Sequence, residues 1–413
     1  AVHAQRVRSV LRHEPTPAYR RRALPWLDAH STVPTPRASA YAACWAPLHV
    51  ADAAHAAASC ILTATRRAPT SHHAQAEVSA CHMVAALLDG DTSCAPSVHS
   101  TLVTLPLAHG LAARRSGPLR MLVLTRGALA ANAAHGGAWG VARVLRLEHA
   151  ALRTQLADVP LGARAIAASG ALERSKEAEV TWSGGVRCAL RVRACAATSH
   201  GGGAVACGAY AITGGLGGLG LRAAALLVEG GASRALLASR GGGAMQRGQG
   251  LRAQQRPLGA GAEVVACDSA DSIDTSTLVR AASPHIGVLH AAGVGDKGLL
   301  VELVARRVRW VHAPKALGAW RLHGATAGAP LEACALWSSV GAGLGNVGQA
   351  SYAAANASLD APALWGRARG EAALSVQWPL VGGAGMGAEA LAAVAERQLK
   401  MSGLAGVSLE AYA

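Results

Sequence analysis

The chain has 413 residues, of which 51% are hydrophobic and 15% are charged, and it carries a formal net charge of +15. This composition excludes an intrinsically disordered chain and leaves room for two or three domains with hydrophobic cores. The basic charge is compatible with nucleic-acid binding, but the arginines are scattered. Their one dense cluster, residues 19–22, is not interleaved with aromatic residues for base stacking. We therefore expect a solvated basic surface and no nucleic-acid partner.

Cysteine and histidine usage narrows the class of protein further. The nine cysteines form no Cys-x-x-Cys pair, and the 17 histidines show no metal-binding spacing. This pattern favours free thiols in a reducing compartment, the cytoplasm, and argues against a disulfide framework or a metal site. No apolar run approaches the roughly 20 residues of a membrane-spanning helix. The chain begins at Ala1 without a methionine, so we expect a fragment, and organelle targeting stays open.

The first half of the chain predicts a linker followed by an α/β unit. Residues 1–38 are rich in arginine and proline without sustained periodicity, which is typical of a linker. We assign residues 39–200 to the first folded unit. Within it, residues 121–128 predict a buried strand, residues 138–152 an amphipathic helix and residues 186–194 an alternating strand. A stretch of small residues at 196–208 marks a junction.

The second half shows a clearer pattern, and we assign residues 201–400 to it. Short apolar strands alternate with helical segments, which is typical of a doubly wound parallel sheet. The strands are expected at residues 209–213, 234–240, 262–268, 285–293, 332–339 and 373–378. Residues 401–413 are interpreted as a C-terminal tail. The predicted fold class is therefore α/β with a Rossmann-like sheet.

A glycine-rich loop follows the first strand of this sheet and opens a helix. It contains a GxGxxG pattern formed by Gly215, Gly217 and Gly220. Such a loop turns tightly, lets its backbone approach a pyrophosphate and places the phosphates at a helix N-terminus. In its strand–loop–helix context the motif predicts a dinucleotide site. The residues assigned to it are Thr213, Gly215, Leu216, Gly217, Gly218, Leu219 and Gly220.

The end of the next strand indicates which dinucleotide is bound. An NAD-binding protein places an acidic residue about 20 positions after the loop, whereas this chain has Ser239 and Arg240. An arginine can bind the 2′-phosphate of NADPH through charge-assisted hydrogen bonds. The alternative is an arginine that merely ends a strand in solvent. Further contacts with NADPH are expected from Asp268 and Ser269 near the adenine and from the small-residue strand end His290, Ala291, Ala292 and Gly293.

Three residues near the fifth strand have the chemistry needed to reduce a ketone. Tyr352 can donate a proton, because its unperturbed pKa is about 10. Ser339 can hold the carbonyl oxygen, and Asn356 lies four residues after Tyr352 on the same helical face. A tyrosine acid needs a nearby cation, yet a lysine is absent where Asn356 stands.

The order of these motifs resembles the ketoreductase domain of type I modular polyketide synthases, a branch of the short-chain dehydrogenases/reductases. In that branch lysine and asparagine exchange places, and the matching lysine here is Lys315 in "APKALGAW". The resemblance implies a catalytic tetrad of Lys315, Ser339, Tyr352 and Asn356. Upstream segments such as "AWGVARVLRLEH" resemble the family's structural subdomain, a truncated Rossmann-like fold without cofactor. The likeness is specific over residues 207–380, moderate over 41–200, absent over 1–38 and weak after about 390.

Three departures from the family pattern concern stereochemistry and the lid. The family often has LDD where this chain has Gly295, Asp296 and Lys297, and another stereochemical class carries Trp where Leu344 stands. Product configuration therefore stays open. The segment 376–387 has Gln377 where the family usually has Asn, and it is one residue short after Trp378. The resemblance implies that this segment covers the nicotinamide and that Met386 belongs to the lid.

The expected function is NADPH-dependent reduction of a β-ketoacyl thioester carried by an acyl carrier protein, as part of polyketide biosynthesis. Neighbouring synthase domains are the expected partners. Two alternatives stay open: the ketoreductase of a type I fatty acid synthase, and a catalytically silent domain that still binds nucleotide. Neighbouring domains would separate the first alternative from the main expectation, and the complete tetrad argues against the second.

Overall fold

The computed structural model describes residues 40–47, 59–64, 83–88, 94–113, 120–129, 132–160, 177–183, 185–195, 206–243, 251–283 and 286–382. The predicted linker, the predicted tail, most of the predicted junction and Met386 lie outside these ranges. No helix in the described part of the chain is both long and apolar enough to cross a membrane.

The first half of the described chain builds a mixed sheet of seven strands, in the order β1-β7-β6-β5-β4-β3-β2. Strands β2 to β6 run parallel, whereas β7 is antiparallel to both β1 and β6. Helices α2 (Val98–Ala112) and α3 (Gly136–Glu148) accompany this sheet. The strands are β1 (Ala40–Pro47), β2 (Ser59–Ala64), β3 (Met83–Leu88), β4 (Arg120–Arg126), β5 (Gln155–Val159), β6 (Glu179–Ser183) and β7 (Val186–Cys195).

The second half builds a parallel sheet of six described strands, in the order β10-β9-β8-β11-β12-β13. The order reverses between β8 and β11, and ligands of such sheets bind at the carboxyl ends of the strands beside this reversal. The predicted doubly wound α/β fold is confirmed. The strands are β8 (Ala209–Thr213), β9 (Arg234–Ser239), β10 (Ala262–Ala266), β11 (Ile286–His290), β12 (Leu331–Ser339) and β13 (Ala373–Trp378).

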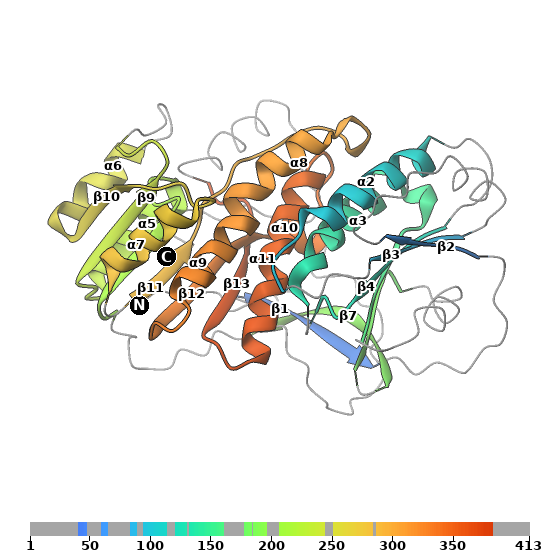
Figure 1. Ribbon diagram of the computed structural model, residues 1–413, viewed down its shortest axis with the longest axis horizontal. Helices are drawn as coiled ribbons and strands as arrows, with labels where there is room; N and C mark the ends of the chain where they lie inside the picture. Colours follow the sequence, from blue (N-terminus) through green and yellow to red (C-terminus); the bar gives the residue numbers. More distant parts are fainter. Residues whose placement is uncertain are drawn as a thin grey trace, which may run out of the picture.

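Helices of the second half flank this sheet and extend toward the first half (Figure 1). They are α5 (Gly218–Glu229), α6 (Leu251–Gln255), α7 (Ser272–Ala282), α8 (Ala305–His312), α9 (Gly318–Thr326), α10 (Val340–Leu344) and α11 (Ala350–Ala368). A five-residue π-helical turn, Ala313–Leu317, joins α8 to α9.

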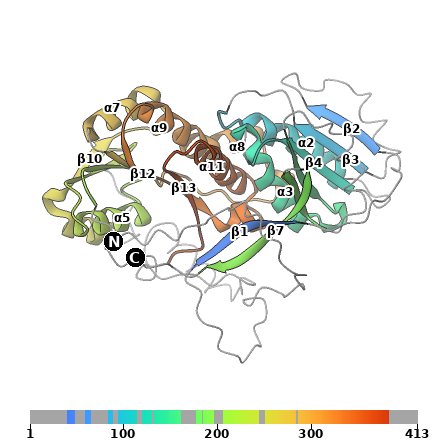
Figure 2. The same cartoon turned by 90° about the horizontal axis from the view of Figure 1, so that it is seen from below.

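Helix α11 lies between the two halves and is seen nearly end-on in Figure 2. Glycines of α3 let the two helix backbones touch. A Cβ added to Gly140 would lie 2.3 Å from the carbonyl oxygen of Ala353, and one added to Gly136 would lie 2.7 Å from Cβ of Ala361. Only glycine fits such an approach. The first half is therefore in direct backbone contact with the helix that carries Tyr352.

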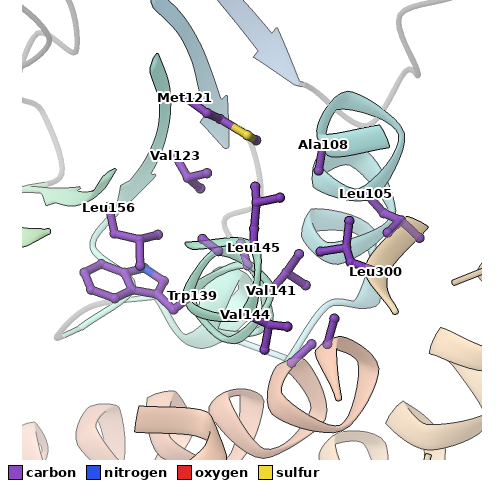
Figure 3. Close-up of a cluster of buried hydrophobic side chains, with 14 of the residues drawn as sticks. Leu105, Ala108, Met121, Val123, Trp139, Val141, Val144, Leu145, Leu156 and Leu300 are labelled. Atoms are coloured by element: carbon purple, nitrogen blue, oxygen red, sulfur yellow. The ribbon is translucent and has the colours of Figure 1, made fainter. Parts of the chain in front are cut away.

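The two halves also share a hydrophobic core (Figure 3). Met121 and Leu145 come from the first half, whereas Leu300 and Ala353 come from the second, and all four are at most 1% exposed. Burial of apolar side chains across the junction stabilises both halves together. The division between residues 200 and 201 stays a prediction, because it falls outside the described residues.

Candidate active site

The glycine loop lies at the carboxyl end of β8, pressed against its neighbours. A Cβ on Gly215 would lie 2.7 Å from Cα of Leu237, and one on Gly220 would lie 2.5 Å from the carbonyl oxygen of Gly214. Gly217 is the N-cap of α5 in an extended conformation and offers no side chain to the first amides of the helix. The glycines therefore let the loop pack tightly on β9 and on itself at the start of α5, the place where the sequence predicts a pyrophosphate.

Gly214 is a residue of this loop that the sequence interpretation missed. Its φ is +67°, a conformation that favours glycine, and a Cβ there would lie 2.7 Å from the backbone of Ala291 and Ala292. The loop therefore touches the predicted strand end 291–293. The signal was present in the sequence as the first of two adjacent glycines, Gly214 and Gly215.

The residues predicted to select NADPH lie at the end of β9. Ser239 is half-buried and Arg240 is exposed. Among the described residues none forms an ion pair with Arg240, so its guanidinium is available to a phosphate. Asp268, after β10, is half-buried, and its carboxylate accepts a hydrogen bond from the amide of Ala270 at 3.0 Å.

Three of the predicted cofactor residues use their side chains on the protein itself. His290 is fully buried, with Nδ1 2.7 Å from Oγ1 of Thr213 and Nε2 2.8 Å from the carbonyl oxygen of Lys315. Ser269 donates to the carbonyl oxygen of Pro314 at 3.1 Å. Burial, followed by the charge of Lys315, lowers the pKa of His290 to about 3, so its imidazole is neutral. These side chains hold the π-helical turn in place, and their contact with a cofactor stays a prediction.

Lys315 lies within that turn and points into the protein. Its side chain is buried, and Nζ donates to the carbonyl oxygen of Trp337 at 3.1 Å and lies 5.7 Å from the centre of the Tyr352 ring. The aliphatic part of Lys315 packs so closely on Gly293 that a Cβ there would be 2.6 Å from Cε. Burial lowers the pKa of Lys315 to about 8, although the charge of Asp360 opposes the shift. The required cation is therefore beside the tyrosine.

Tyr352, Ser339 and Asn356 converge at the carboxyl end of β12. Ser339 ends this strand, while Tyr352 and Asn356 lie one turn apart on α11. Burial raises the pKa of Tyr352, whereas contacts of its hydroxyl with Asn356 and Ser339 lower it. The amide nitrogen of Asn356 donates to the carbonyl oxygen of Tyr352 at 2.9 Å. The other amide atom, Oδ1, is buried and has no hydrogen-bond partner among the described residues, which leaves an acceptor inside the site.

In the segments that depart from the family pattern, Asp296 and Gln377 form side-chain hydrogen bonds. Asp296 accepts hydrogen bonds from Ser351 and Arg307, whereas Lys297 is exposed. Gln377 donates to the carboxylate of Asp360 at 2.7 Å. Gln377 and Leu344 line a cavity of about 120 Å³ between the two halves.

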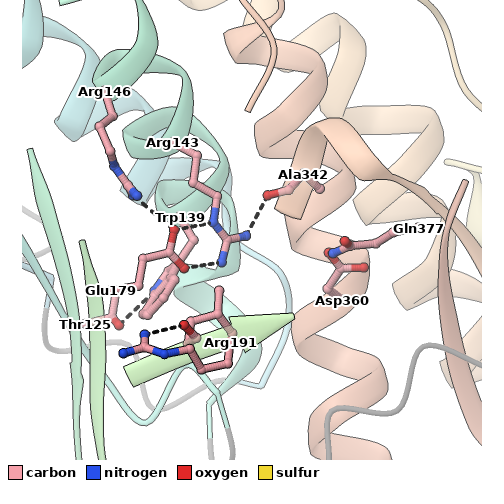
Figure 4. A network of polar contacts seen from close by, with 10 residues as sticks. Thr125, Trp139, Arg143, Arg146, Glu179, Arg191, Ala342, Asp360 and Gln377 are labelled. Atoms are coloured by element: carbon pink, nitrogen blue, oxygen red, sulfur yellow. Dashed lines mark hydrogen bonds and ion pairs between the residues drawn. The ribbon is translucent and has the colours of Figure 1, made fainter. Parts of the chain in front are cut away.

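Arg143 and Asp360 line this cavity, and Figure 4 shows the polar contacts around them. Arg143 of α3 pairs with Glu179 at 2.7 Å and donates to the carbonyl oxygen of Ala342 at 2.5 Å, just beyond Ser339. Asp360 is held by Ser375 at 2.6 Å and by Gln377, and burial raises its pKa. Sequence reasoning missed both charges, because neither belongs to a local motif.

Comparison with known proteins identifies the family. The model of the KR domain matches residues 208–383. Polyketide synthase GfsB of Streptomyces halstedii is 36% identical over 335 residues, which are 75% of this chain and 6% of that protein. The chain thus spans a small part of the curated relatives it matches.

Solved structures extend the match over both halves. An A1-type ketoreductase superposes with a TM-score of 0.77 at 27% identity, over 94% of this chain and 89% of that one. The first ketoreductase of the tylosin PKS is 30% identical, with a TM-score of 0.69 over 84% of this chain and 83% of that one. The resemblance recognised in the motifs is confirmed. This chain belongs to the ketoreductase domains of polyketide synthases.

Proposed function

We propose that the chain reduces a β-ketoacyl thioester to the β-hydroxyacyl thioester, with NADPH as the reductant. The observation that carries this proposal is the convergence of Lys315, Ser339 and Tyr352 beside the glycine loop. The lysine is buried with Nζ 5.7 Å from the tyrosine ring, and the serine contacts the tyrosine hydroxyl. An acid, a hydrogen-bond donor and a cation are the groups that carbonyl reduction requires.

In the proposed reaction each of the four residues has a separate role. Ser339 and Tyr352 hold the ketone oxygen, and the developing alkoxide takes the proton of the Tyr352 hydroxyl. Lys315, as an ammonium ion, stabilises the tyrosinate that remains. The Oδ1 atom of Asn356, which has no partner among the described residues, would accept a hydrogen bond from the group that returns a proton to the Tyr352 hydroxyl. The reduced nicotinamide, when bound, supplies the hydride.

The glycine loop and the end of β9 are the proposed NADPH-binding elements. Gly215 and Gly220 let the loop pack closely at the start of α5, where the pyrophosphate would bind, and the exposed Arg240 would bind the 2′-phosphate. An acidic side chain at the end of β9 would repel that phosphate, and this chain has none between Ser239 and Gly243.

The proposed substrate is carried by the phosphopantetheine arm of an acyl carrier protein, and neighbouring synthase domains would be the partners. Support comes from the relatives, which are named as polyketide synthases and are far longer than this chain. A cytoplasmic location, expected from the dispersed cysteines, belongs to the same proposal. The match to polyketide synthases argues against the alternative of a fatty acid synthase parent.

The experiment follows NADPH oxidation at the nicotinamide absorbance, with a β-ketoacyl thioester of a small pantetheine mimic as substrate. We expect wild type to turn over and Tyr352→Phe to lose at least about 10²-fold in kcat, as expected for removal of a general acid. Chiral analysis of the product would give its configuration. NADPH binding without turnover in wild type would instead favour the silent nucleotide-binding domain.

A further inference from the structure

Glu148, the last residue of α3, connects the cofactor-free half to the second half. Its Oε2 accepts a hydrogen bond from the amide of Leu300 at 2.6 Å, and its Oε1 accepts one from the amide of Gly348 at 2.7 Å. The partners are 152 and 200 positions away in the chain. Both carboxylate oxygens are thus used on backbone amides of the other half. Hydrogen bonds to a charged acceptor are stronger than neutral ones.

The two amides lie in two segments that meet just before Tyr352. Residues 291–300 follow β11, and residues 345–349 lead into α11, whose third residue is Tyr352. The segments are bonded to each other, since the amide of Gly298 donates to the carbonyl oxygen of Gly348 at 2.9 Å. A contact that holds one segment in place therefore also restrains the other.

Two further hydrogen bonds hold these segments, in addition to the two made by Glu148. The Nε2 atom of His109, on α2, lies 2.6 Å from the carbonyl oxygen of Leu300. Asp296, in the first segment, accepts a hydrogen bond from Ser351, the residue before Tyr352. The backbone of Leu300 is thus held at its amide and its carbonyl by the first half, while the same segment holds the start of α11.

We propose that Glu148 is a positioning residue that fixes the place of the Tyr352 hydroxyl. This inference rests on the proposed reductase function and names the route by which the cofactor-free half serves the reaction. The carboxylate acts through the two segments and not on the substrate. A glutamine of the same size keeps one carbonyl acceptor but turns an NH₂ group toward the second amide, so one of the two bonds is lost. Small displacements of a catalytic group reduce turnover steeply, with about 10²-fold lost for about 1 Å.

The test compares Glu148→Gln with Glu302→Gln in the full chain. Glu302 is the matched control, because it is an exposed glutamate near Leu300 whose carboxylate accepts only a long bond, 3.3 Å, from the amide of Leu299. Amide hydrogen exchange is measured on peptides that cover residues 295–303 and 343–353. Steady-state kinetics are measured with the thioester and with NADPH as the varied substrates.

We expect Glu148→Gln to exchange at least about 10-fold faster in both peptides, because an amide without its partner opens more often. We expect its kcat to fall about 10- to 100-fold while KM for NADPH changes less than about 2-fold, since the glycine loop is untouched. Glu302→Gln should match wild type in every measurement.

Two results would overturn the inference. One is exchange and kcat in Glu148→Gln that equal those of the control. The other is a parallel loss of NADPH binding and of protection throughout the second sheet, which would show a general structural role. If wild type itself does not reduce the thioester, the proposed function fails, and the exchange measurement still decides whether Glu148 holds the two segments.

Discussion

At the scale of single residues, the site depends on a lysine that the fold buries. Lys315 reaches Tyr352 because a π-helical turn lets its side chain point inward, and His290 and Ser269 hold that turn through its carbonyl oxygens. A fold that buries a cation must offset the lost hydration, here through the carbonyl of Trp337 and the nearby charge of Asp360. The result is a lysine whose pKa is low enough to titrate near physiological pH.

The pH dependence of turnover follows from this lysine. Its pKa is about 8, so kcat should fall as pH rises through about 8 and the ammonium ion is lost. Lys315→Met should lack this fall and have a kcat at pH 7 about 10²-fold below wild type. A wild-type profile that stays flat to pH 9.5 would contradict the assignment.

The free energy of unfolding should also depend on the protonation of Lys315. The folded pKa of Lys315 lies below its ordinary value of 10.5, so the unfolded chain binds more protons between these two pH values. The contribution of Lys315 to the unfolding free energy therefore rises between about pH 8 and 10.5 and is at its most unfavourable below pH 8. Denaturant unfolding of wild type and Lys315→Met across this range measures it.

Arg240 is the second residue with a direct prediction. Arg240→Ala should raise KM for NADPH about 10- to 100-fold, because a charge-assisted bond to the 2′-phosphate is lost. KM for NADH should change little. The matched control is Arg280→Ala, an exposed arginine in the last turn of α7. Its neighbour Ala281 accepts a hydrogen bond from Arg234 at the start of β9, so Arg280 lies toward the end of this strand opposite to Arg240. Equal effects on NADPH and NADH would argue against a phosphate contact.

At the scale of elements, the packing of α3 on α11 links the two halves. Two glycines of α3, Gly136 and Gly140, meet α11 with so little space that an added methyl group overlaps its backbone atoms. Interiors are close-packed, so such a contact does not relax without moving a helix. A shift of α11 would carry Tyr352 with it.

Gly140→Ala tests this contact. A methyl group there would lie 2.3 Å from the carbonyl oxygen of Ala353, so we expect the unfolding free energy to fall by about 2 kcal/mol or more. Gly110→Ala is the control, because Gly110 is on α2 with no atom within 4 Å of the added methyl group. There, higher helix propensity should raise stability by up to about 1 kcal/mol. Similar denaturation midpoints for the two variants would show that the helices separate easily.

Elements with strong local patterns were predictable from sequence, and long-range contacts were not. The second sheet alternates so regularly with helices that all six of its described strands were expected, and β4 and β7 of the first half were also predicted. Helix α3 was placed from 138 to 152, but it runs from Gly136 to Glu148, because a short 3₁₀ turn capped by Asn132 starts it early and His149 leaves the helical conformation. Strands β1 to β3, β5 and β6 were not individually predicted. The runs around β1 and β3 are rich in alanine and give little hydrophobic contrast, and β5 and β6 are only five residues long.

In the candidate site, too, residues in local motifs were predictable from the sequence and long-range contacts were not. The glycine loop, Ser339, Tyr352 and Asn356 follow from local sequence, whereas Lys315 came only from the family resemblance, because its place depends on contacts with β11 and β12. Glu148 was not predicted, as its partners are 152 and 200 positions away. Side-chain use also differed from expectation, since His290 and Ser269 bind the lysine turn.

At the scale of the whole molecule, the two halves act as one support for α11. Residues from both halves share one hydrophobic core, and Arg143, His109 and Glu148 of the first half bond to the backbone of the second. The first half thus has a physical reason to accompany the second, although the glycine loop and the proposed tetrad lie outside it. The proposed catalytic residues all lie in the second half, and contacts from the first half position the segments that carry them.

The most direct test of this account is deuterium transfer. NADPH deuterated at both C4 positions is incubated with the β-ketoacyl thioester and wild-type protein, and the product is analysed by mass spectrometry. The account predicts one deuterium on the β-carbon of a single hydroxy enantiomer, formed at least about 10²-fold more slowly by Tyr352→Phe. Wild-type protein that binds NADPH but forms no deuterated product would contradict the central claim.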